Sequence, residues 1–216
     1  MTTLEVPVPF IKILKPTTTI LWSIVYILII RRGFKDKTYG MPILACIMNL
    51  SMEFKSLFIF SYGTFFYLGN IAWFFLDLII FYQIIIFFPK KNKLLFYLYL
   101  SFGLIFWFFI IEISLKINNW IVYSSFFQNF LMSLLFIDFL KKDDFPKGQS
   151  IYIGIFKFLG TFSAIVYLFA INLFPTFDLI TKYIIFCIPI CDIIYVYFFY
   201  KKRNKVNFDQ YFNPGT

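Results

Sequence analysis

Residues 39–58 read YGMPILACIMNLSMEFKSLF, an apolar stretch long enough to cross a bilayer that carries Glu53 deep inside it. Placing an ionised carboxylate at mid-membrane costs several kcal/mol, about 3 on insertion scales. A chain that keeps such an acid usually pairs it or uses it for function. Asp77, Glu112 and Asp192 lie in other apolar segments and raise the same question.

The rest of the chain is also strongly apolar. Hydrophobic residues make up 61% and aromatic residues 25% of its 216 positions, and the mean hydropathy is +0.80. A soluble domain has no interior large enough for so much apolar surface. The apolar runs are continuous over about 20 residues, which is typical of membrane helices and not of an outer-membrane barrel. We therefore predict an all-α, polytopic membrane protein.

Breaker residues and charged loops divide the chain into seven predicted transmembrane helices in one bundle. Their predicted ranges are 12–30, 40–61, 65–88, 94–115, 119–140, 150–174 and 179–200. We expect residues 1–200 to form a single seven-helix domain. Residues 201–216 are expected to be a polar cytoplasmic tail with no fold of its own.

Basic residues predict the orientation of this bundle. They follow the first, third, fifth and seventh spans, whereas the other loops carry almost none: Arg31, Arg32, Lys35, Lys37, Lys90, Lys91, Lys93, Lys141, Lys142, Lys147, Lys201, Lys202, Arg203 and Lys205. The positive-inside rule then places the C-terminus in the cytoplasm and the N-terminus outside. The net charge of +9 reflects this topology and attraction to anionic lipid headgroups, so we expect no nucleic-acid partner.

Several kinds of chemistry lack the residues that they need. The chain has no His, and Cys46, Cys187 and Cys191 lie within predicted spans, so we expect neither a zinc or haem site nor a structural disulfide. Asp143 and Asp144 do not extend to the DDxxD pattern that binds magnesium-diphosphate. No glycine-rich phosphate loop and no GxSxG motif is present. We predict that the protein uses no metal and no cofactor.

Three of the buried acids fit either a functional or a structural role. Asn49 and Glu53 are four residues apart and share a helix face, so they form either an acid–amide pair in a pocket or a clamp between helices. Asp77 shares a stripe with Trp73, where it could hold a developing cation beside the indole or accept an interhelical hydrogen bond. Asp192 follows Pro189, and proline can bend a helix toward a cavity.

A structural role is the expectation for the remaining charged residues. Lys55 and Glu112 lie at similar depth, which predicts an ion pair between the second and fourth spans. Asp138 and Lys157 are expected to be interfacial charges. The stripe of polar residues in the fifth span either lines a cavity or joins helices, and the sequence leaves both open: Ser125, Asn129 and Ser133, with Gln128 alongside.

Residues 39–45 (YGMPILA) and 49–53 (NLSME) together resemble the second-helix signature of the integral-membrane terpene cyclases. These small proteins serve fungal meroterpenoid and indole-diterpene biosynthesis and have bacterial relatives. Further stretches similar to that family are 72–77 (AWFFLD), 128–133 (QNFLMS), 148–150 (GQS) with 157–161 (KFLGT), and 191–195 (CDIIY). Met52 departs from the pattern, because the family usually has Trp before the acid, so a wall of the pocket is expected to differ.

The resemblance implies an enzyme that cyclises a linear prenyl or polyprenyl chain, epoxidised or not, by protonation and without metal or diphosphate ionisation. The acids held essential in the family correspond to Glu53 and Asp192. We expect Glu53 to donate the proton, because burial favours a protonated carboxyl group, with Asp192 as its partner. Asp77 and aromatic faces would stabilise the positive charge. The expected substrate-binding residues are Tyr39, Asn49, Trp73, Asn129 and Tyr195.

Two other readings stay open on the sequence alone. The first is a proton-coupled small-molecule transporter or a seven-helix receptor, since buried acids also relay protons in transporters. Against the transporter, no inverted repeat is visible. The second is a purely structural role for the acids as helix clamps, which predicts that neutral isosteres cost stability but no activity. The expected partners are an apolar isoprenoid substrate and the lipid bilayer, either a bacterial inner membrane or a eukaryotic ER-type membrane.

Overall fold

The computed structural model describes residues 8–58, 64–88, 93–114, 120–141 and 146–212. These described residues form seven α-helices and one short 3₁₀ turn, with no strand, so the all-α prediction is confirmed for them. In chain order the elements are α1 (Val8–Asp36), α2 (Ile43–Phe58), α3 (Thr64–Phe87), α4 (Lys93–Ser114), α5 (Trp120–Lys141), α6 (Ile151–Ala170), η1 (Phe174–Thr176) and α7 (Leu179–Phe212).

Among the described residues, six helices are long and apolar enough to cross a membrane: α1 and α3 to α7. The exception is α2, whose 16 residues extend over about 24 Å, less than a hydrocarbon core of about 30 Å. It begins directly after Pro42, later than predicted, and residues 59–63 at its predicted end lie outside the described part.

Helix ends also differ from the prediction in α1, α6 and α7. α1 runs from Val8 to Asp36 rather than over 12–30, because its helix continues beyond both ends of the predicted range and, after it, into the polar residues 31–36. α6 ends at Ala170 rather than at residue 174, because Asn172 takes a left-handed backbone conformation (φ 55°) and the 3₁₀ turn follows. α7 continues through Tyr200 to Phe212, so the predicted tail begins as an extension of the last helix. Hydropathy detects only the apolar part of α7, whereas Lys and Arg are good helix formers and extend it.

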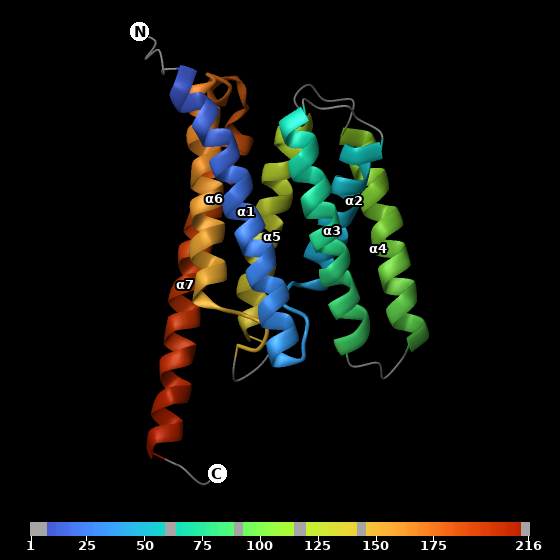
Figure 1. Ribbon diagram of the computed structural model, residues 1–216, viewed down its shortest axis with the longest axis vertical. Coiled ribbons are helices and arrows are strands. Elements are labelled where there is room, and N and C mark those ends of the chain that lie inside the picture. Colours follow the sequence, from blue (N-terminus) through green and yellow to red (C-terminus); the bar gives the residue numbers. More distant parts are fainter. Residues whose placement is uncertain (1–7, 59–63, 89–92, 115–119, 142–145, 213–216) are drawn as a thin grey trace.

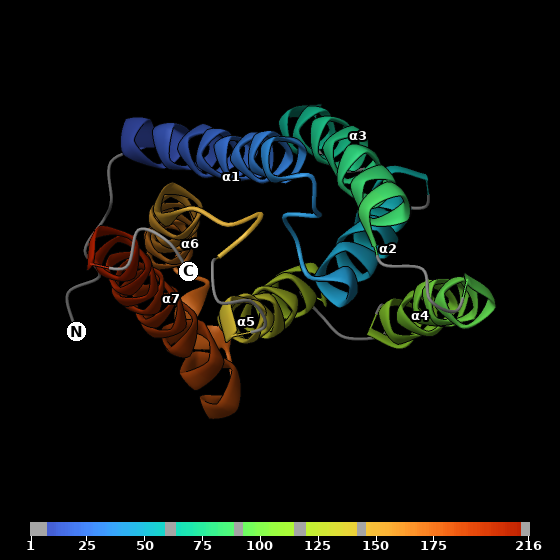
Figure 2. The same cartoon turned by 90° about the horizontal axis from the view of Figure 1, so that it is seen from below.

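The helices run along one long axis, with α1 starting at one end of the molecule and α7 finishing at the other (Figure 1). α1 packs against α6 and α3, α5 packs against α7, and α2 lies against α3, α4 and α5. Seen along the axis, α1, α3, α2, α5, α7 and α6 follow one another around a ring, and α4 lies outside it beside α2 (Figure 2). Polar residues of α2 therefore face other helices.

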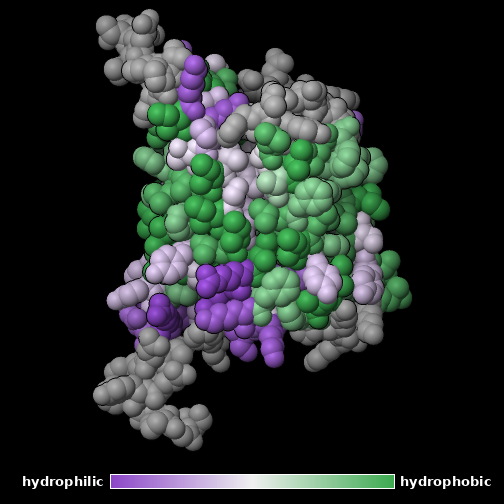
Figure 3. Space-filling model, viewed as in Figure 1, coloured by the Kyte–Doolittle hydropathy of each residue, from purple (hydrophilic) through white to green (hydrophobic). Residues whose placement is uncertain are grey.

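The outer surface of the bundle is apolar. Large side chains such as Ile20 and Phe102 are 59% and 70% exposed. Figure 3 shows an apolar belt across the viewed face, with most of the hydrophilic side chains gathered below it, toward the end where α7 finishes. An exterior of this kind is stable against lipid hydrocarbon and not against water.

Candidate active site

A cavity of about 610 Å³ lies between α1, α2, α3, α5 and α6. Its wall is mainly apolar and aromatic, with a small set of polar groups, as is usual for small-molecule sites. The lining residues are Thr18, Trp22, Tyr26, Asn49, Met52, Glu53, Ser56, Asn70, Trp73, Val122, Ser125, Phe126, Gln128, Asn129, Met132 and Ala164. Of the predicted site residues, Glu53, Asn49, Trp73 and Asn129 line this cavity.

The polar end of the cavity is built around the phenol of Tyr26. Its hydroxyl lies 3.0 Å from Oε1 of Glu53 and 3.3 Å from Oδ2 of Asp77, and Nδ2 of Asn49 donates to it at 2.8 Å. Glu53 is 6% exposed, and Asp77 is fully buried. We call Tyr26, Asn49, Glu53 and Asp77 the acid pair cluster.

Neighbouring helices fix the orientation of this cluster. Nε2 of Gln128 in α5 donates to Oδ1 of Asn49, so the amide of Asn49 must turn its own N–H group toward Tyr26. Trp73 in α3 donates through Nε1 to Ser23 at 3.1 Å, which holds the indole at the cavity wall. The side chains that surround Glu53 are thus oriented before any ligand binds.

Some buried polar atoms of the described residues have no hydrogen-bond partner within the protein. Near the cavity these are Oε2 of Glu53, Oδ1 of Asp77, Oε1 of Gln128 and Oδ1 of Asn129. An unpartnered polar atom in an apolar setting costs about 1–3 kcal/mol, so each of these atoms needs a hydrogen bond from a proton on a neighbouring carboxyl group, from a water molecule or from a ligand. Glu53 therefore has one oxygen bound to Tyr26 and the other free.

Asp192 lies in a second polar group, away from Glu53. Its Oδ1 forms an ion pair with Nζ of Lys157 at 2.7 Å and accepts a hydrogen bond from Ser133 at 2.9 Å. Neither Asp192 nor Lys157 is among the residues that line the cavity. We call Ser133, Lys157 and Asp192 the ion pair cluster; it joins α5, α6 and α7.

The expectation that Lys157 is an interfacial charge was wrong. Its side chain is buried, with Nζ 5.7 Å from the ring centroid of Trp22 at the cavity wall. Position within one helix does not predict the partner, Asp192, that keeps Lys157 inside the bundle. The other ion-pair prediction is confirmed, because Lys55 of α2 binds Glu112 of α4.

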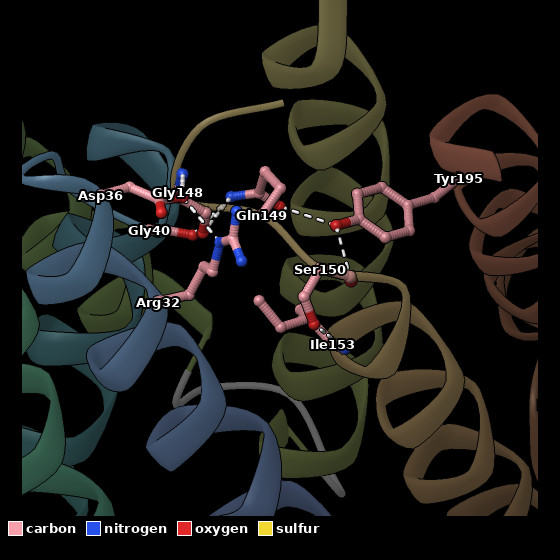
Figure 4. Close-up of polar contacts among 8 residues, drawn as sticks. All are labelled: Arg32, Asp36, Gly40, Gly148, Gln149, Ser150, Ile153 and Tyr195. Carbon is pink, nitrogen blue, oxygen red and sulfur yellow. Dashed lines mark hydrogen bonds and ion pairs between the residues drawn. The ribbon is translucent and has the colours of Figure 1, made fainter. Parts of the chain in front are cut away.

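Tyr39 and Tyr195 do not line the cavity. Ring contacts place Tyr39 against Phe88 and Phe139. The hydroxyl of Tyr195 lies 2.8 Å from Oε1 of Gln149 and 3.3 Å from the carbonyl oxygen of Ser150 (Figure 4). Both tyrosines are thus placed for packing and helix joining, and their predicted binding roles stay predictions.

Gln149 and Gly148 join three parts of the chain at the end where α6 begins. Gln149 also donates to the carbonyl oxygen of Gly40, and the backbone N–H of Gly148 donates to Asp36, which pairs with Arg32 at 2.6 Å (Figure 4). Gly148 has φ +72°, and a Cβ there would lie 2.7 Å from a backbone oxygen of Tyr39. Residues of the GQS and YGMP stretches thus contact each other and join the loops that precede α6 and α2. We call this contact the clasp.

Sequence reasoning missed Tyr26. The residue is the only Tyr in α1, a long apolar helix that offers the membrane interior few other hydrogen-bonding side chains. Its hydroxyl was the feature that could have identified it as a site residue. A buried Tyr hydroxyl usually finds a partner, and that rule points from α1 toward the acids of α2 and α3. The stripe in α5 was left undecided, and Ser125, Gln128 and Asn129 do line the cavity.

The fold and the cavity can now be set beside known proteins. The family model of the Pyr4-like transmembrane terpene cyclases matches residues 7–205. The chain belongs to this family. A 66-residue segment is 35% identical to the terpene cyclase macJ of Penicillium terrestre, covering 31% of this chain and 26% of that protein. The match thus spans about a quarter of the length of that relative.

Membership in this family makes the chain an integral membrane protein of the terpene cyclase class, as the sequence predicted. The apolar outer surface and the apolar cavity of this transmembrane terpene cyclase homologue agree with that assignment. No solved structure matches the chain.

Proposed function

We propose that the protein cyclises a linear prenyl or polyprenyl substrate, epoxidised or not, with Glu53 as the proton donor. The observation that carries this proposal is the setting of the Glu53 carboxyl group. It lines a largely apolar cavity of about 610 Å³, has a free oxygen, and is bound to the phenol of Tyr26 and not to a cation. A carboxyl group in such surroundings keeps its proton until a substrate takes it.

The reaction needs no change of oxidation state. Glu53 gives its proton to a terminal alkene or epoxide oxygen, and the π electrons of successive double bonds form the new C–C bonds. The faces of Trp22, Trp73 and Phe126 line the route and attract the positive charge. Loss of a proton from the last cation to a base or a water molecule ends the cascade and leaves an isomer of the substrate.

Asp77 and Asp192 enter the proposal differently from what the resemblance implied. Asp77 lies behind Tyr26 and does not line the cavity, so we assign it no direct contact with the travelling cation. The ion pair of Asp192 with Lys157 supports a positioning role, in which it holds α5, α6 and α7 around the cavity. A catalytic role for Asp192 stays a prediction from the resemblance.

The proposed topology has seven spans, with α2 as one of them, the C-terminus in the cytoplasm and the N-terminus outside. The distribution of basic residues supports this orientation. Residues 1–200 would form one unit, followed by a cytoplasmic segment that begins inside α7. Either a bacterial inner membrane or an ER-type membrane fits this arrangement.

The test is incubation of membranes that contain the protein with plain and epoxidised farnesyl and geranylgeranyl compounds. We expect a new cyclic product from the wild type and none from Glu53→Gln at equal expression. Asp178→Asn is the matched control, because Asp178 lies in an exposed turn before α7. A Glu53→Gln variant that still cyclises the substrate would remove Glu53 from its role. Substrate uptake that depends on a proton gradient, with no product formed, would favour transport.

A further inference from the structure

The phenol of Tyr26 has three hydrogen-bond neighbours, and their chemistry restricts where protons lie. A phenol carries one proton and two lone pairs, and the amide N–H group of Asn49 is a donor. Tyr26 can therefore donate to only one of the two carboxyl groups within reach, at 3.0 Å and 3.3 Å. All three contacts are satisfied together when the other carboxyl group donates its own proton to Tyr26.

The positions of the two acids determine the direction in which a proton can move through the phenol. Glu53 lines the cavity and has Oε2 free, whereas Asp77 is fully buried and lies off the cavity. A proton used in the cavity must leave from Glu53. Within this cluster Asp77 is the second carboxyl group, and the phenol, which contacts both acids, offers it a route to Glu53.

We propose that Tyr26 relays a proton from Asp77 to Glu53 as Glu53 protonates the substrate. This relay rests on the proposed function and adds a role for two side chains that the reaction itself does not require. The O–H bond on Oε2 of Glu53 breaks as the substrate takes that proton. The Tyr26 proton moves to Oε1 of Glu53, and the Asp77 proton moves from Oδ2 to the oxygen of Tyr26.

The three transfers balance and leave one negative charge, now on Asp77. Glu53 ends neutral, with its proton on Oε1, and Tyr26 ends neutral as well. The charge has moved from the cavity wall to a carboxylate behind it. A carboxylate left on Glu53 would lie against the carbocation and act as a base too early, so the relay protects the cascade from premature loss of a proton. The proton released at the end of the cascade returns to the acid pair cluster and restores its starting protonation state.

The test is a proton inventory under single-turnover conditions, with the protein purified in lipid nanodiscs and in excess over an accepted prenyl substrate. The rate is measured in mixtures of H₂O and D₂O. A bowl-shaped dependence on the deuterium fraction is expected for the wild type, because several protons move in one step. Tyr26→Phe and Asp77→Asn should give straight lines, rates lower by about 10–100-fold, and a several-fold larger share of partly cyclised products.

Tyr82→Phe is the matched control, because Tyr82 lies on α3 one turn and a half beyond Asp77 and is 55% exposed. It should keep the wild-type curve and products. A straight line for the wild type, or unchanged curvature in a folded Tyr26→Phe or Asp77→Asn protein, would overturn the relay. Failure of the proposed function is distinct, because it shows as no wild-type product or as activity in Glu53→Gln. Where both variants fail to fold, a straight line for the wild type still overturns the relay.

Discussion

The acid pair cluster and the ion pair cluster both bury carboxyl groups inside one bundle, yet their partners differ. Glu53 and Asp77 share the neutral phenol of Tyr26, whereas Asp192 lies 2.7 Å from the ammonium group of Lys157. Two neighbouring carboxylates in a low dielectric cannot both ionise at ordinary cost, so the first cluster holds protons. In the second cluster the ammonium group of Lys157 lies directly against an oxygen of Asp192, which is the geometry of a buried ion pair.

This difference shows that burial alone does not identify a catalytic acid. All three acids are buried, and sequence reasoning gave each of them a functional role. In the proposed function the partner separates them, because Glu53 is bound to a phenol and Asp192 to an ammonium group.

The largest expected effect is on the activity of the acid pair cluster. Glu53→Gln should lower the cyclisation rate by about 10²–10⁴-fold, the usual contribution of a general acid. Its unfolding midpoint should stay close to that of the wild type, because the Gln carbonyl oxygen still accepts from Tyr26. Product formation and thermal unfolding are measured on the same preparation. Large destabilisation without specific loss of activity would make Glu53 a helix clamp.

The ion pair cluster should respond in stability. Lys157→Met leaves Asp192 buried without its cation, which costs about 3–5 kcal/mol of unfolding free energy. The double variant Lys157→Met with Asp192→Leu should recover much of this loss, since a well-packed apolar pair replaces a buried ion pair at little cost. Denaturant unfolding in detergent measures both. An Asp192→Asn variant that folds normally and makes no product would instead support a catalytic Asp192.

The clasp should show a smaller effect on stability. Gly148→Ala forces a side chain into a left-handed conformation and toward the backbone of Tyr39, which costs about 1–3 kcal/mol. Gly69→Ala in α3 is a useful comparison, since a Cβ there meets only the methyl group of Thr19 at 3.1 Å. Thermal unfolding of the two variants should differ clearly. Equal unfolding midpoints would show that the clasp does not stabilise the fold.

The smallest effect concerns Asp178, an exposed acid outside both clusters. Hydrogen bonds from the backbone N–H and the hydroxyl of Thr181 hold the pKa of Asp178 below its usual value. A lowered folded-state pKa means that the stabilisation is complete above the unfolded pKa of about 3.9 and is lost as the pH falls through the lower folded value. Asp178→Asn should therefore reduce the difference in unfolding midpoint between pH 7 and acid pH. A pH dependence equal to that of the wild type would contradict a stabilising role for the hydrogen bonds between Thr181 and Asp178.

The helical class, the helix count and most helix ends followed from the sequence, since continuous apolar runs identify membrane helices whatever surrounds them. The ends of α1, α2, α6 and α7 did not. A proline, a left-handed Asn172 and a polar continuation of the helix set those ends, and hydropathy detects none of them. The Lys55–Glu112 pair was predictable, because both residues lie at one depth on spans that the short loops bring together.

The candidate site was predictable in part for a similar reason. Helical spacing placed Asn49 beside Glu53 and Trp73 beside Asp77, and those stripes do meet at the cavity. Spacing within one helix gives no information about which stripe faces which. The sequence could therefore mark Tyr26 as a hydroxyl that needs a partner, but it could not show that Tyr26 joins the two stripes or that Lys157 binds Asp192.

The sequence by itself determined that this chain is a helical membrane protein with acids in its interior, because hydropathy and charge are properties of segments. The tertiary structure alone decided which acid lies beside a phenol and which beside a lysine. The physical reason is that the free energy of a buried charge depends on groups within a few ångströms, and here those groups come from helices far apart in the chain.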